Sequence, residues 1–231
     1  MNLEPKLEQV RQEYVSRLTK QCHDSALPEV LRHITARTGK MLRPRLTLLA
    51  AATLGDECFN SRRTLLLATA MEMLHNASLL HDDIIDRADT RRGQPSVNAR
   101  WGNATAVLVG DYLLAQVMHL LDEADDRVAT RLVNRTVIEM VESELLQQKA
   151  LKQSSDQVIK QYLAIIDGKT ARLFATACAI GNPLYEDFGL HYGRLFQMRD
   201  DIADGEAPDF VNQLIEQETQ ELNNLQYKLS I

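Results

Sequence analysis

Apolar residues recur along this chain at steps of three and four, a spacing typical of amphipathic helices. The first examples are Leu3, Leu7, Val10, Tyr14 and Leu18, which predict an opening helix with one buried stripe. Strand-like alternation of apolar and polar residues is almost absent, and so are hairpin dipeptides. The pattern therefore favours a helical protein.

Longer runs of the same kind follow. Between Arg62 and Asp86 there is no Gly or Pro, and Leu, Ala and Met are abundant. Pro44 follows a basic GKMLR stretch and fits the first turn of the helix that carries LTLLAAATL. Short Gly- or Pro-containing breaks separate the runs. The other predicted helices span about 104–122, 128–151, 156–180, 186–203 and 209–229.

The last of these runs mixes an apolar spacing with many Glu, Gln and Asn residues, so we expect a solvent-facing helix that packs on one side. Its apolar positions are Val211, Leu214, Ile215, Leu222, Leu225 and Leu229. We see no linker, low-complexity tract or exact repeat. The sequence therefore predicts one all-α domain over residues 1–231, a bundle of antiparallel helices around a shared core.

Composition narrows the class of protein. With 45% hydrophobic and 25% charged residues, the 231-residue chain has ample material for a core. The net charge of −6 argues against nucleic acid as a partner, because phosphate binding leaves a basic footprint. The three scattered cysteines, a charged N-terminal stretch and the lack of a run of roughly 18 apolar residues favour a cytoplasmic protein with at most peripheral membrane contact.

The stretch SLLHDDIIDRADTRRG places carboxylates at the end of an apolar helix. Asp82 and Asp86 are four residues apart and project from one face. Like charges at this spacing destabilise a helix, and the helix dipole disfavours anions at a C-terminal end. Carboxylates placed here despite the repulsion and the helix dipole favour a binding site for Mg²⁺, which prefers oxygen ligands and substrate phosphates. The alternative is a solvated acidic helix end.

A second motif of the same spacing favours the metal interpretation. LFQMRDDIAD places Asp200, Asp201 and Asp204 at the end of another apolar run. Two such helices that face each other would hold several Mg²⁺ ions between them, bridged by a diphosphate.

Basic residues gather near predicted helix ends, where they suit phosphate oxygens. His75 lies seven residues before Asp82 on about the same face, and a core histidine is the alternative for it. The GKT triplet is no Walker A motif, because the upstream glycine and strand are missing. Taken singly, each cation fits an ordinary surface position. Together they indicate two phosphorylated substrates; the residues are Lys40, Arg43, Arg91, Arg92 and Lys169.

Five segments in order resemble the trans-isoprenyl diphosphate synthases, nearest the long-chain, octaprenyl-like branch. They are GKMLRP, EMLHNASLLHDDIIDRADTRRG, VLVGDYLLA, GKTARLF and FQMRDDIAD, within about residues 25–205. The resemblance implies antiparallel helices around a deep cavity, usually as a homodimer. It also implies a prenyltransferase that condenses isopentenyl diphosphate head to tail (1′-4) with an allylic diphosphate, with Mg²⁺ as cofactor.

The resemblance also implies roles for individual residues. The Mg²⁺–allylic diphosphate cluster would use Asp82, Asp83, Asp86, Asp200, Asp201 and Asp204. Isopentenyl diphosphate would be held by Lys40, Arg43, His75 and Arg92. The allylic substrate would contact Arg91, Lys169, Thr170 and Gln197.

In this family Mg²⁺ neutralises the leaving diphosphate, the allylic C–O bond ionises, and the double bond of isopentenyl diphosphate attacks the cation. Thr170 and Gln197 offer oxygen dipoles toward that cation. Ala77 and Ser78 lie about one turn before Asp82. In the family, a bulky aromatic residue there stops elongation early, so the resemblance implies that these small residues leave room for a long product; the alternative is that they are ordinary helix-packing residues. Met118 is another candidate for the cavity floor. A long product favours use in quinone side chains.

The chain departs from the family after Asp204. GEAPDF passes almost directly into one tail helix, the expected glycine–lysine loop has no counterpart, and we expect a shortened C-terminal region after about residue 205. Three alternatives to the long-chain synthase stay open. They are a weakly active or non-catalytic subunit of a heteromeric prenyl synthase, a class I terpene synthase, and a helical interaction protein.

Overall fold

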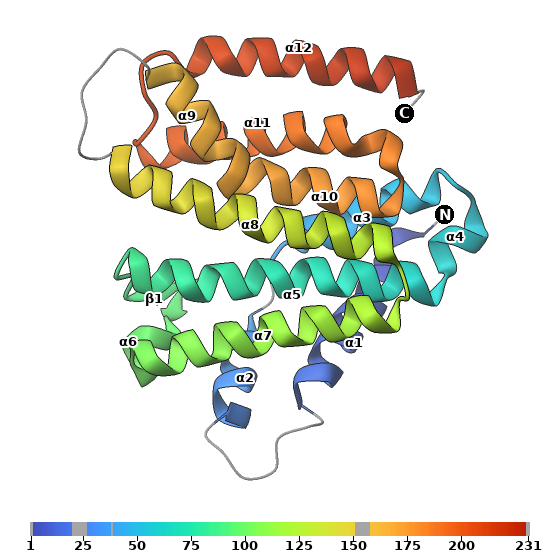
Figure 1. Ribbon diagram of the computed structural model, residues 1–231, viewed down its shortest axis with the longest axis vertical. Helices are drawn as coiled ribbons and strands as arrows, with labels where there is room; N and C mark the ends of the chain where they lie inside the picture. The colour runs from blue at the N-terminus through green and yellow to red at the C-terminus, as the bar shows by residue number, and fades with distance from the viewer. Residues whose placement is uncertain (1, 20–26, 38, 151–157, 230–231) are drawn as a thin grey trace. The chain divides into compact units, whose positions relative to one another are not determined.

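Helices make up nearly all the regular structure that the computed structural model describes, which covers residues 2–19, 27–37, 39–150 and 158–229 (Figure 1). The all-α prediction is therefore confirmed. Two units, Met1–Arg127 and Val128–Ile231, are described in turn. That residues 1–231 form a single domain around one deep cavity stays a prediction.

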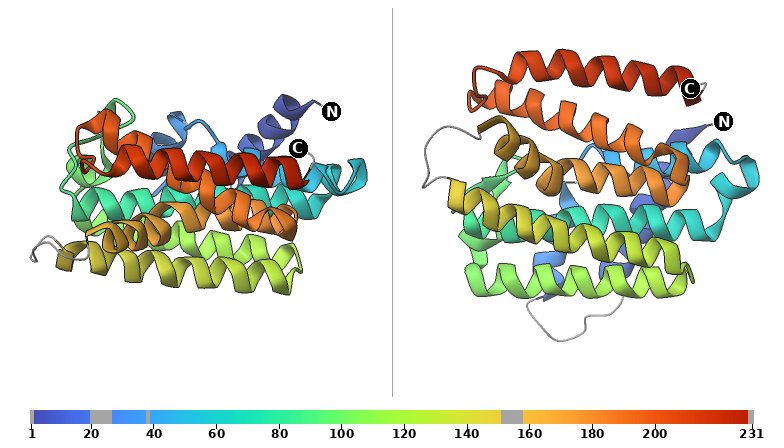
Figure 2. Two further views of the ribbon diagram at one scale, coloured as in Figure 1. Left: turned by 90° about the horizontal axis from the view of Figure 1, so that it is seen from above. Right: turned by 45° about the horizontal axis from the view of Figure 1, so that its top comes forward.

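Unit 1 has a central helix, α5 (Arg62–Ile85), whose sides are nearly all buried. It begins where the Ser61 side chain accepts a hydrogen bond from the Thr64 amide at 3.1 Å, the usual N-cap arrangement. The helix packs against α1, α3 and α7, and α7 runs antiparallel beside it (Figures 1 and 2). The elements around α5 are α1 (Leu3–Thr19), α2 (Leu27–Ala36), α3 (Leu42–Ala52), α4 (Asp56–Asn60), α6 (Val97–Trp101) and α7 (Asn103–Glu123).

The predicted stripe of α1 is confirmed: Leu7, Val10, Tyr14 and Leu18 are buried. Between α5 and α6 the chain forms a hairpin, which the sequence did not signal. Strand β1 (Thr90–Arg91) pairs antiparallel with β2 (Gln94–Pro95). Arg92 and Gly93 make the turn with φ angles of 53° and 71°. Two positive φ angles are what a tight two-residue hairpin requires, and Gly adopts them at no steric cost.

Helix α7 is long and apolar enough to cross a membrane by length and composition, contrary to the sequence expectation that no run would qualify. Core helices of soluble proteins pass the same test. About 44% of its most apolar window is buried inside the structure, and its buried residues face α5 and α6. We therefore describe α7 as a packed helix of unit 1.

Unit 2 consists of helices as well. They are α8 (Arg127–Ala150), α9 (Val158–Ile166), α10 (Arg172–Gly181), η2 (Pro183–Tyr185), α11 (Glu186–Asp204) and α12 (Val211–Leu229). The run predicted over about 156–180 is helical from Val158 onward, and residues 156–157 lie outside the described residues. The sequence did not indicate the π-helical turn η1 (Asp167–Ala171), which lies between α9 and α10. Helix α11 packs against both α10 and α12. Helix α12 buries Val211, Leu214 and Glu218 on one side.

Small residues bring α11 close to η1 and α10. A Cβ atom added at Gly193 would lie 2.5 Å from the Ala171 Cα, and one at Gly189 would lie 2.6 Å from the Phe174 carbonyl oxygen. Both neighbours are backbone atoms, which cannot rotate away. Close approach of these helices therefore depends on glycine.

We expect Gly193→Ala to lower the free energy of unfolding by about 1–3 kcal/mol, because the new methyl must push α11 away from η1. Urea denaturation measures this. As a control, Ala203→Ser at an exposed position of α11 should change the free energy of unfolding by less than about 0.5 kcal/mol. Equal stabilities of Gly193→Ala and the wild type would contradict the proposed close packing.

Candidate functional site

In unit 1 the first aspartate motif lies at the C-terminal end of α5. Asp86 directly follows the helix, and its amide donates to the Asp82 carbonyl oxygen at 2.8 Å. The Asp82 side chain is half-buried and that of Asp86 is exposed. The last carbonyl groups of a helix carry partial negative charge, so carboxylates at this end strengthen a site for a cation.

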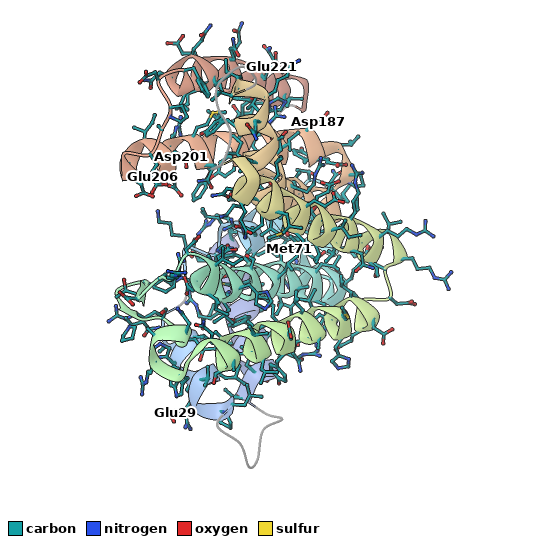
Figure 3. All side chains as sticks on the ribbon, turned by 60° about the vertical axis from the view of Figure 1, so that its left-hand side comes forward. Glu29, Met71, Asp187, Asp201, Glu206 and Glu221 are labelled. Atoms are coloured by element: carbon teal, nitrogen blue, oxygen red, sulfur yellow. The ribbon has the colours of Figure 1, made fainter. Side chains whose placement is uncertain are left out.

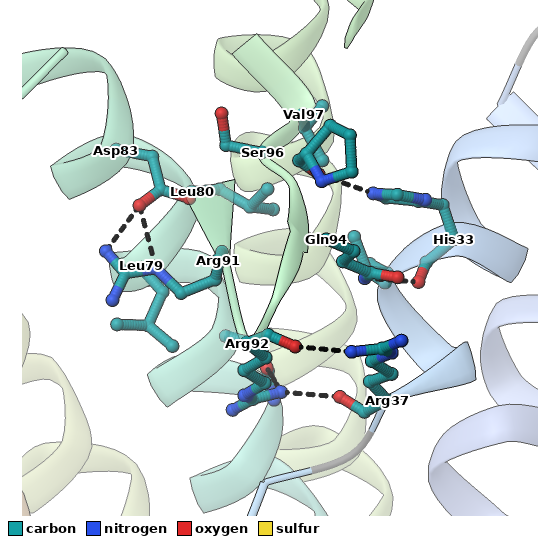
Figure 4. A pocket seen from close by; sticks show the side chains of 13 residues that line it. His33, Arg37, Leu79, Leu80, Asp83, Arg91, Arg92, Gln94, Ser96 and Val97 are labelled. Atoms are coloured by element: carbon teal, nitrogen blue, oxygen red, sulfur yellow. Dashed lines mark hydrogen bonds and ion pairs between the residues drawn. The ribbon is translucent and has the colours of Figure 1, made fainter. Parts of the chain in front are cut away.

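Asp83 differs from its neighbours because the residue is only 3% exposed. Arg91 of β1 donates to the Asp83 Oδ1 atom through Nε at 2.8 Å and also through Nη2 (Figure 4). The Asp83 backbone carbonyl accepts from the Ala88 amide at 2.9 Å. Asp83 therefore ties the hairpin to α5 and orients Arg91.

The predicted isopentenyl diphosphate residues come together in part. Arg43 of α3 is 8% exposed, and its Nη1 atom lies 3.2 Å from the His75 Nε2 atom. A guanidinium can only donate, so His75 accepts and is neutral at that nitrogen. Burial lowers the pKa of His75 well below its usual range, and the charges of Arg43, Arg92 and Arg91 lower it further. Lys40 is exposed just before α3.

Two buried polar residues of α5 belong to this group, and sequence reasoning missed them. Glu72 is 2% exposed; burial raises its pKa, and the charges of Arg43 and Arg92 oppose that rise. Asn76 donates from Nδ2 to the Glu72 Oε1 atom at 3.2 Å and accepts from the Arg92 Nη1 atom at 3.2 Å. A lone carboxylate inside the apolar stretch TAMEMLHN was the available signal.

Figure 4 shows that His33 of α2 and Arg37, the residue that follows α2, contact the hairpin. The His33 Nε2 atom lies 2.8 Å from the Pro95 carbonyl oxygen, and Gln94 donates to the His33 carbonyl oxygen at 3.1 Å. Arg37 donates to the Arg92 carbonyl oxygen at 3.0 Å. A cavity of about 40 Å³ lies among these residues, lined also by Asn76 and Asp83.

In unit 2 the second motif ends α11, where Gly205 takes a left-handed conformation. Figure 3 shows Asp201 and Glu206 near this end and Asp187 toward the other. Asp200 and Asp204 are exposed. Asp201 is half-buried: its Oδ1 atom accepts from Gln197 at 2.7 Å, and its Oδ2 atom accepts from the Tyr162 hydroxyl at 2.5 Å.

The two motifs thus share one arrangement within their own units. The second aspartate is held by donors from the protein, namely Arg91 for Asp83, and Gln197 with Tyr162 for Asp201. The first and last aspartates are half-buried or exposed. Burial and the hydrogen bond to Asp201 raise the pKa of Tyr162, so its hydroxyl stays protonated and donates. Tyr162 was not predicted, since its helix shows no charge pattern.

The π-turn η1 carries two predicted residues of the allylic half. Thr170 donates to the Gln197 Oε1 atom at 2.7 Å, so the two predicted oxygen dipoles are in contact. The Lys169 ammonium lies 3.0 Å from the Glu144 Oε2 atom and donates to Gln147 at 3.2 Å; both partners are on α8.

An ion-pair network fixes η1 from the other side. Arg194 of α11 donates to both carboxylate oxygens of Asp167, at 2.5 Å and 2.7 Å. It also donates to Glu218 of α12 at 3.0 Å, and Glu218 pairs with His191. The hydrogen bonds that Arg194 donates to Asp167 are the largest cause of the raised pKa of Arg194. The network connects the tail helix to the turn that carries Lys169.

The predicted chain-length residues lie in three different surroundings. Ala77 is fully buried in unit 1, and Ser78 is half-buried with its hydroxyl donating to the His75 carbonyl oxygen at 2.9 Å. Met118 is 64% exposed on α7. Their effect on product length stays a prediction.

No group of three or more His, Cys, Asp or Glu side chains within the described ranges could hold a metal ion by itself. Each half instead offers carboxylates at a helix C-terminus. This donor set fits Mg²⁺, which is usually bound through one or two carboxylates and completes its shell with water and substrate phosphates.

Comparisons with known proteins agree with the resemblance seen in the sequence. The family model "Polyprenyl synthetase" matches residues 24–211. An all-trans-nonaprenyl-diphosphate synthase (geranyl-diphosphate specific) of Rhodobacter capsulatus is 41% identical over 184 residues, which are 76% of this chain and 56% of the relative. Heptaprenyl diphosphate synthase component 2 of Geobacillus stearothermophilus is 37% identical over 188 residues, or 77% and 58%.

A solved structure agrees in fold. The polyprenyl synthase from Caulobacter crescentus CB15, complexed with calcium and isoprenyl diphosphate, is 34% identical with a TM-score of 0.77. The match covers 86% of this chain and 62% of that one. This chain thus spans less than two thirds of the length of each of the three proteins.

We expect the free energy of unfolding to fall as the pH drops below the usual His pKa of 6.5. Folded His75 has a lowered pKa, so the unfolded chain binds more protons there and the folded state loses up to about 1.4 kcal/mol per pH unit. His75→Gln, which can still accept from Arg43, should show a shallower decline between pH 6.5 and 5. Urea unfolding at several pH values measures this.

His119→Gln controls for removing a histidine, since its side chain is exposed on α7. Parallel pH profiles of the wild type and His75→Gln would contradict a lowered pKa for His75.

Proposed function

Because this chain belongs to the polyprenyl synthetase family, we propose that it is a trans-polyprenyl diphosphate synthase that condenses isopentenyl diphosphate with an allylic diphosphate. The observation that carries the proposal is the pair of aspartate motifs, each at the C-terminal end of a helix. Each has oriented basic or amide side chains beside it, which suits two diphosphate substrates and Mg²⁺.

We assign the Mg²⁺-facing role to Asp82, Asp86, Asp200 and Asp204. Asp83 and Asp201, expected from the resemblance to join them, are better suited to positioning, because each is more buried than the other two aspartates of its motif. Arg91 donates to Asp83, and Gln197 donates to Asp201. When bound, Mg²⁺ would neutralise the charge that develops on the leaving diphosphate.

The basic residues would divide between the two substrates. Lys40, Arg43, His75 and Arg92 would hold isopentenyl diphosphate, with His75 as a neutral partner that orients Arg43. Arg91 and Lys169 would bind the allylic diphosphate, for which Lys169 must exchange Glu144 for phosphate oxygens. The contact between Thr170 and Gln197 presents oxygen dipoles that stabilise positive charge.

The reaction would proceed by ionisation, condensation and elimination. The allylic C–O bond breaks with its electron pair on the diphosphate. The double bond of isopentenyl diphosphate then forms the new C–C bond, and the departing diphosphate takes the proton that is lost. The protein's contribution is to hold both substrates, supply fixed charges and keep water away from the cation.

A long product is the favoured outcome, since one relative is named for a nonaprenyl and another for a heptaprenyl product. A quinone side chain is the use we propose for it. We place the enzyme in the cytoplasm with at most peripheral membrane contact, as α7 packs within unit 1.

A second candidate is a subunit of a heteromeric synthase. The relative from Geobacillus stearothermophilus is named a component, which favours this alternative. Both aspartate motifs are present here, which favours a catalytic subunit over an inactive one.

We expect the chain to incorporate labelled isopentenyl diphosphate into product when it is incubated with Mg²⁺ and geranyl, farnesyl or geranylgeranyl diphosphate. Chromatographic sizing of the product measures its length, which should exceed C20. Incorporation equal to a metal-free control would contradict an enzyme that acts alone. A product of C15 or C20 would contradict the long-chain assignment.

In the same assay Asp82→Ala should lower kcat/KM by a factor of about 10³ or more, because the cation that offsets the leaving charge loses a ligand. Asp187→Ala is the matched control, because Asp187 is exposed at the N-terminal end of α11, away from the second aspartate motif. This variant should keep activity near that of the wild type.

We propose that the chain forms a homodimer through exposed apolar side chains on α8, among them Ile138. Light scattering should give twice the 26.1 kDa chain mass. Ile138→Asp should shift the species toward the monomer, whereas Leu184→Asp should not, although Leu184 of η2 is 72% exposed and Ile138 is 59% exposed. A monomeric wild type at assay concentrations would contradict this proposal.

A further inference from the structure

The Arg92 side chain is held in place before any ligand binds. Its backbone adopts φ 53° at the tip of the hairpin, a conformation that costs a non-glycine residue about 1–2 kcal/mol. The Arg92 Nη1 atom donates to the Arg37 carbonyl oxygen at 3.1 Å and to the Asn76 Oδ1 atom at 3.2 Å. Both acceptors are neutral, so the positive charge of Arg92 is not cancelled by these bonds.

A missing side chain completes the arrangement. A Cβ atom at Gly39 would lie 2.7 Å from the Arg92 Nη2 atom and 3.1 Å from its Cζ atom. What glycine provides here is space for the guanidinium.

Glu72 determines which way the Asn76 amide points. The Nδ2 atom of Asn76 donates to the Glu72 Oε1 atom at 3.2 Å and to the Glu72 carbonyl oxygen at 2.7 Å. Both side chains are at least nine-tenths buried. With its nitrogen turned toward Glu72, the amide must turn its oxygen toward Arg92.

We propose that Gly39, Asn76 and the Arg37 carbonyl form a cradle for Arg92, that Glu72 orients the amide of Asn76, and that the cradle sets the affinity for isopentenyl diphosphate. We call this set the Arg92 cradle. It rests on the proposed function, in which Arg92 binds that substrate. Gly39, Asn76 and Glu72 are positioning residues and need not touch it.

The physical reason is preorganisation. A free arginine side chain carries about 2 kcal/mol of rotamer entropy, which a ligand must otherwise remove on binding. In the cradle the guanidinium is already placed, and its acceptors leave its charge available for phosphate oxygens. Losing the cradle should therefore weaken binding without removing the charge.

Isothermal titration with isopentenyl diphosphate tests this on the full chain. Gly39→Ala and Asn76→Ala should each raise its Kd by about tenfold, and Arg92→Ala should raise it further. In the Arg92→Ala background, Gly39→Ala and Asn76→Ala should have no further effect, because the group they position is gone. The Kd of an allylic diphosphate with Mg²⁺ should stay within about twofold.

Asn76→Ala leaves Glu72 without its side-chain donor and is expected to lower stability, so Gly39→Ala is the decisive variant. Asn60→Ala, an exposed asparagine on α4, is the matched control for loss of an amide. If activity is present, Gly39→Ala should raise KM for isopentenyl diphosphate with little change in kcat. A general loss of structure would change both substrates' constants together.

The two ideas fail in different ways. If Arg92→Ala leaves the Kd of isopentenyl diphosphate unchanged, the assignment of Arg92 to that substrate falls, and the cradle falls with it. If Arg92→Ala weakens binding but Gly39→Ala does not, or if their effects add in full, the cradle is wrong and the proposed function stands.

Discussion

Two helices of this protein end in carboxylates, where the helix dipole disfavours negative charge, and the rest of each helix must offset that cost. Asp82 and Asp86 end α5, and Asp200 and Asp204 end α11, so in each unit negative side chains join a negative helix end. Such an arrangement is unfavourable until a cation offsets it. Packing along the rest of each helix must therefore offset this cost. Helix α5 packs against α1, α3 and α7 among other neighbours, and α11 packs closely through Gly189 and Gly193.

In each unit, some charged side chains are proposed to bind Mg²⁺ or diphosphate, and others hold neighbouring protein groups in place. Asp83 and Asp201 are partnered inside the protein, and Arg194 is fully engaged between Asp167 and Glu218. Glu72 plays a comparable part for the basic group of unit 1. The proposed reaction needs no proton transfer to a protein side chain, so the protein contributes mainly by positioning the substrates and the charges around them.

The helices and the motifs were predictable from sequence because they depend on local patterns. The apolar spacing of residues 3–18 and the uninterrupted run at 62–86 predicted α1 and α5 almost to their ends. The partners of those motifs were not predictable. Glu72 looks like any acidic residue, Tyr162 lies 39 residues from Asp201, and the hairpin at 90–95 has arginine in a conformation that arginine rarely adopts. Long-range contacts and steric gaps leave little trace in a single sequence.

The π-turn η1 adds one residue to a helical turn, so every side chain after it is rotated by about 100° relative to an uninterrupted α-helix. Deleting one residue from 167–171 would restore regular hydrogen bonding and satisfy the backbone better. It would also turn Lys169 and Thr170 away from their present neighbours on α8 and α11. A relative that lacks one residue at this point would therefore have a helix of nearly the same length, but its side chains would face different neighbours.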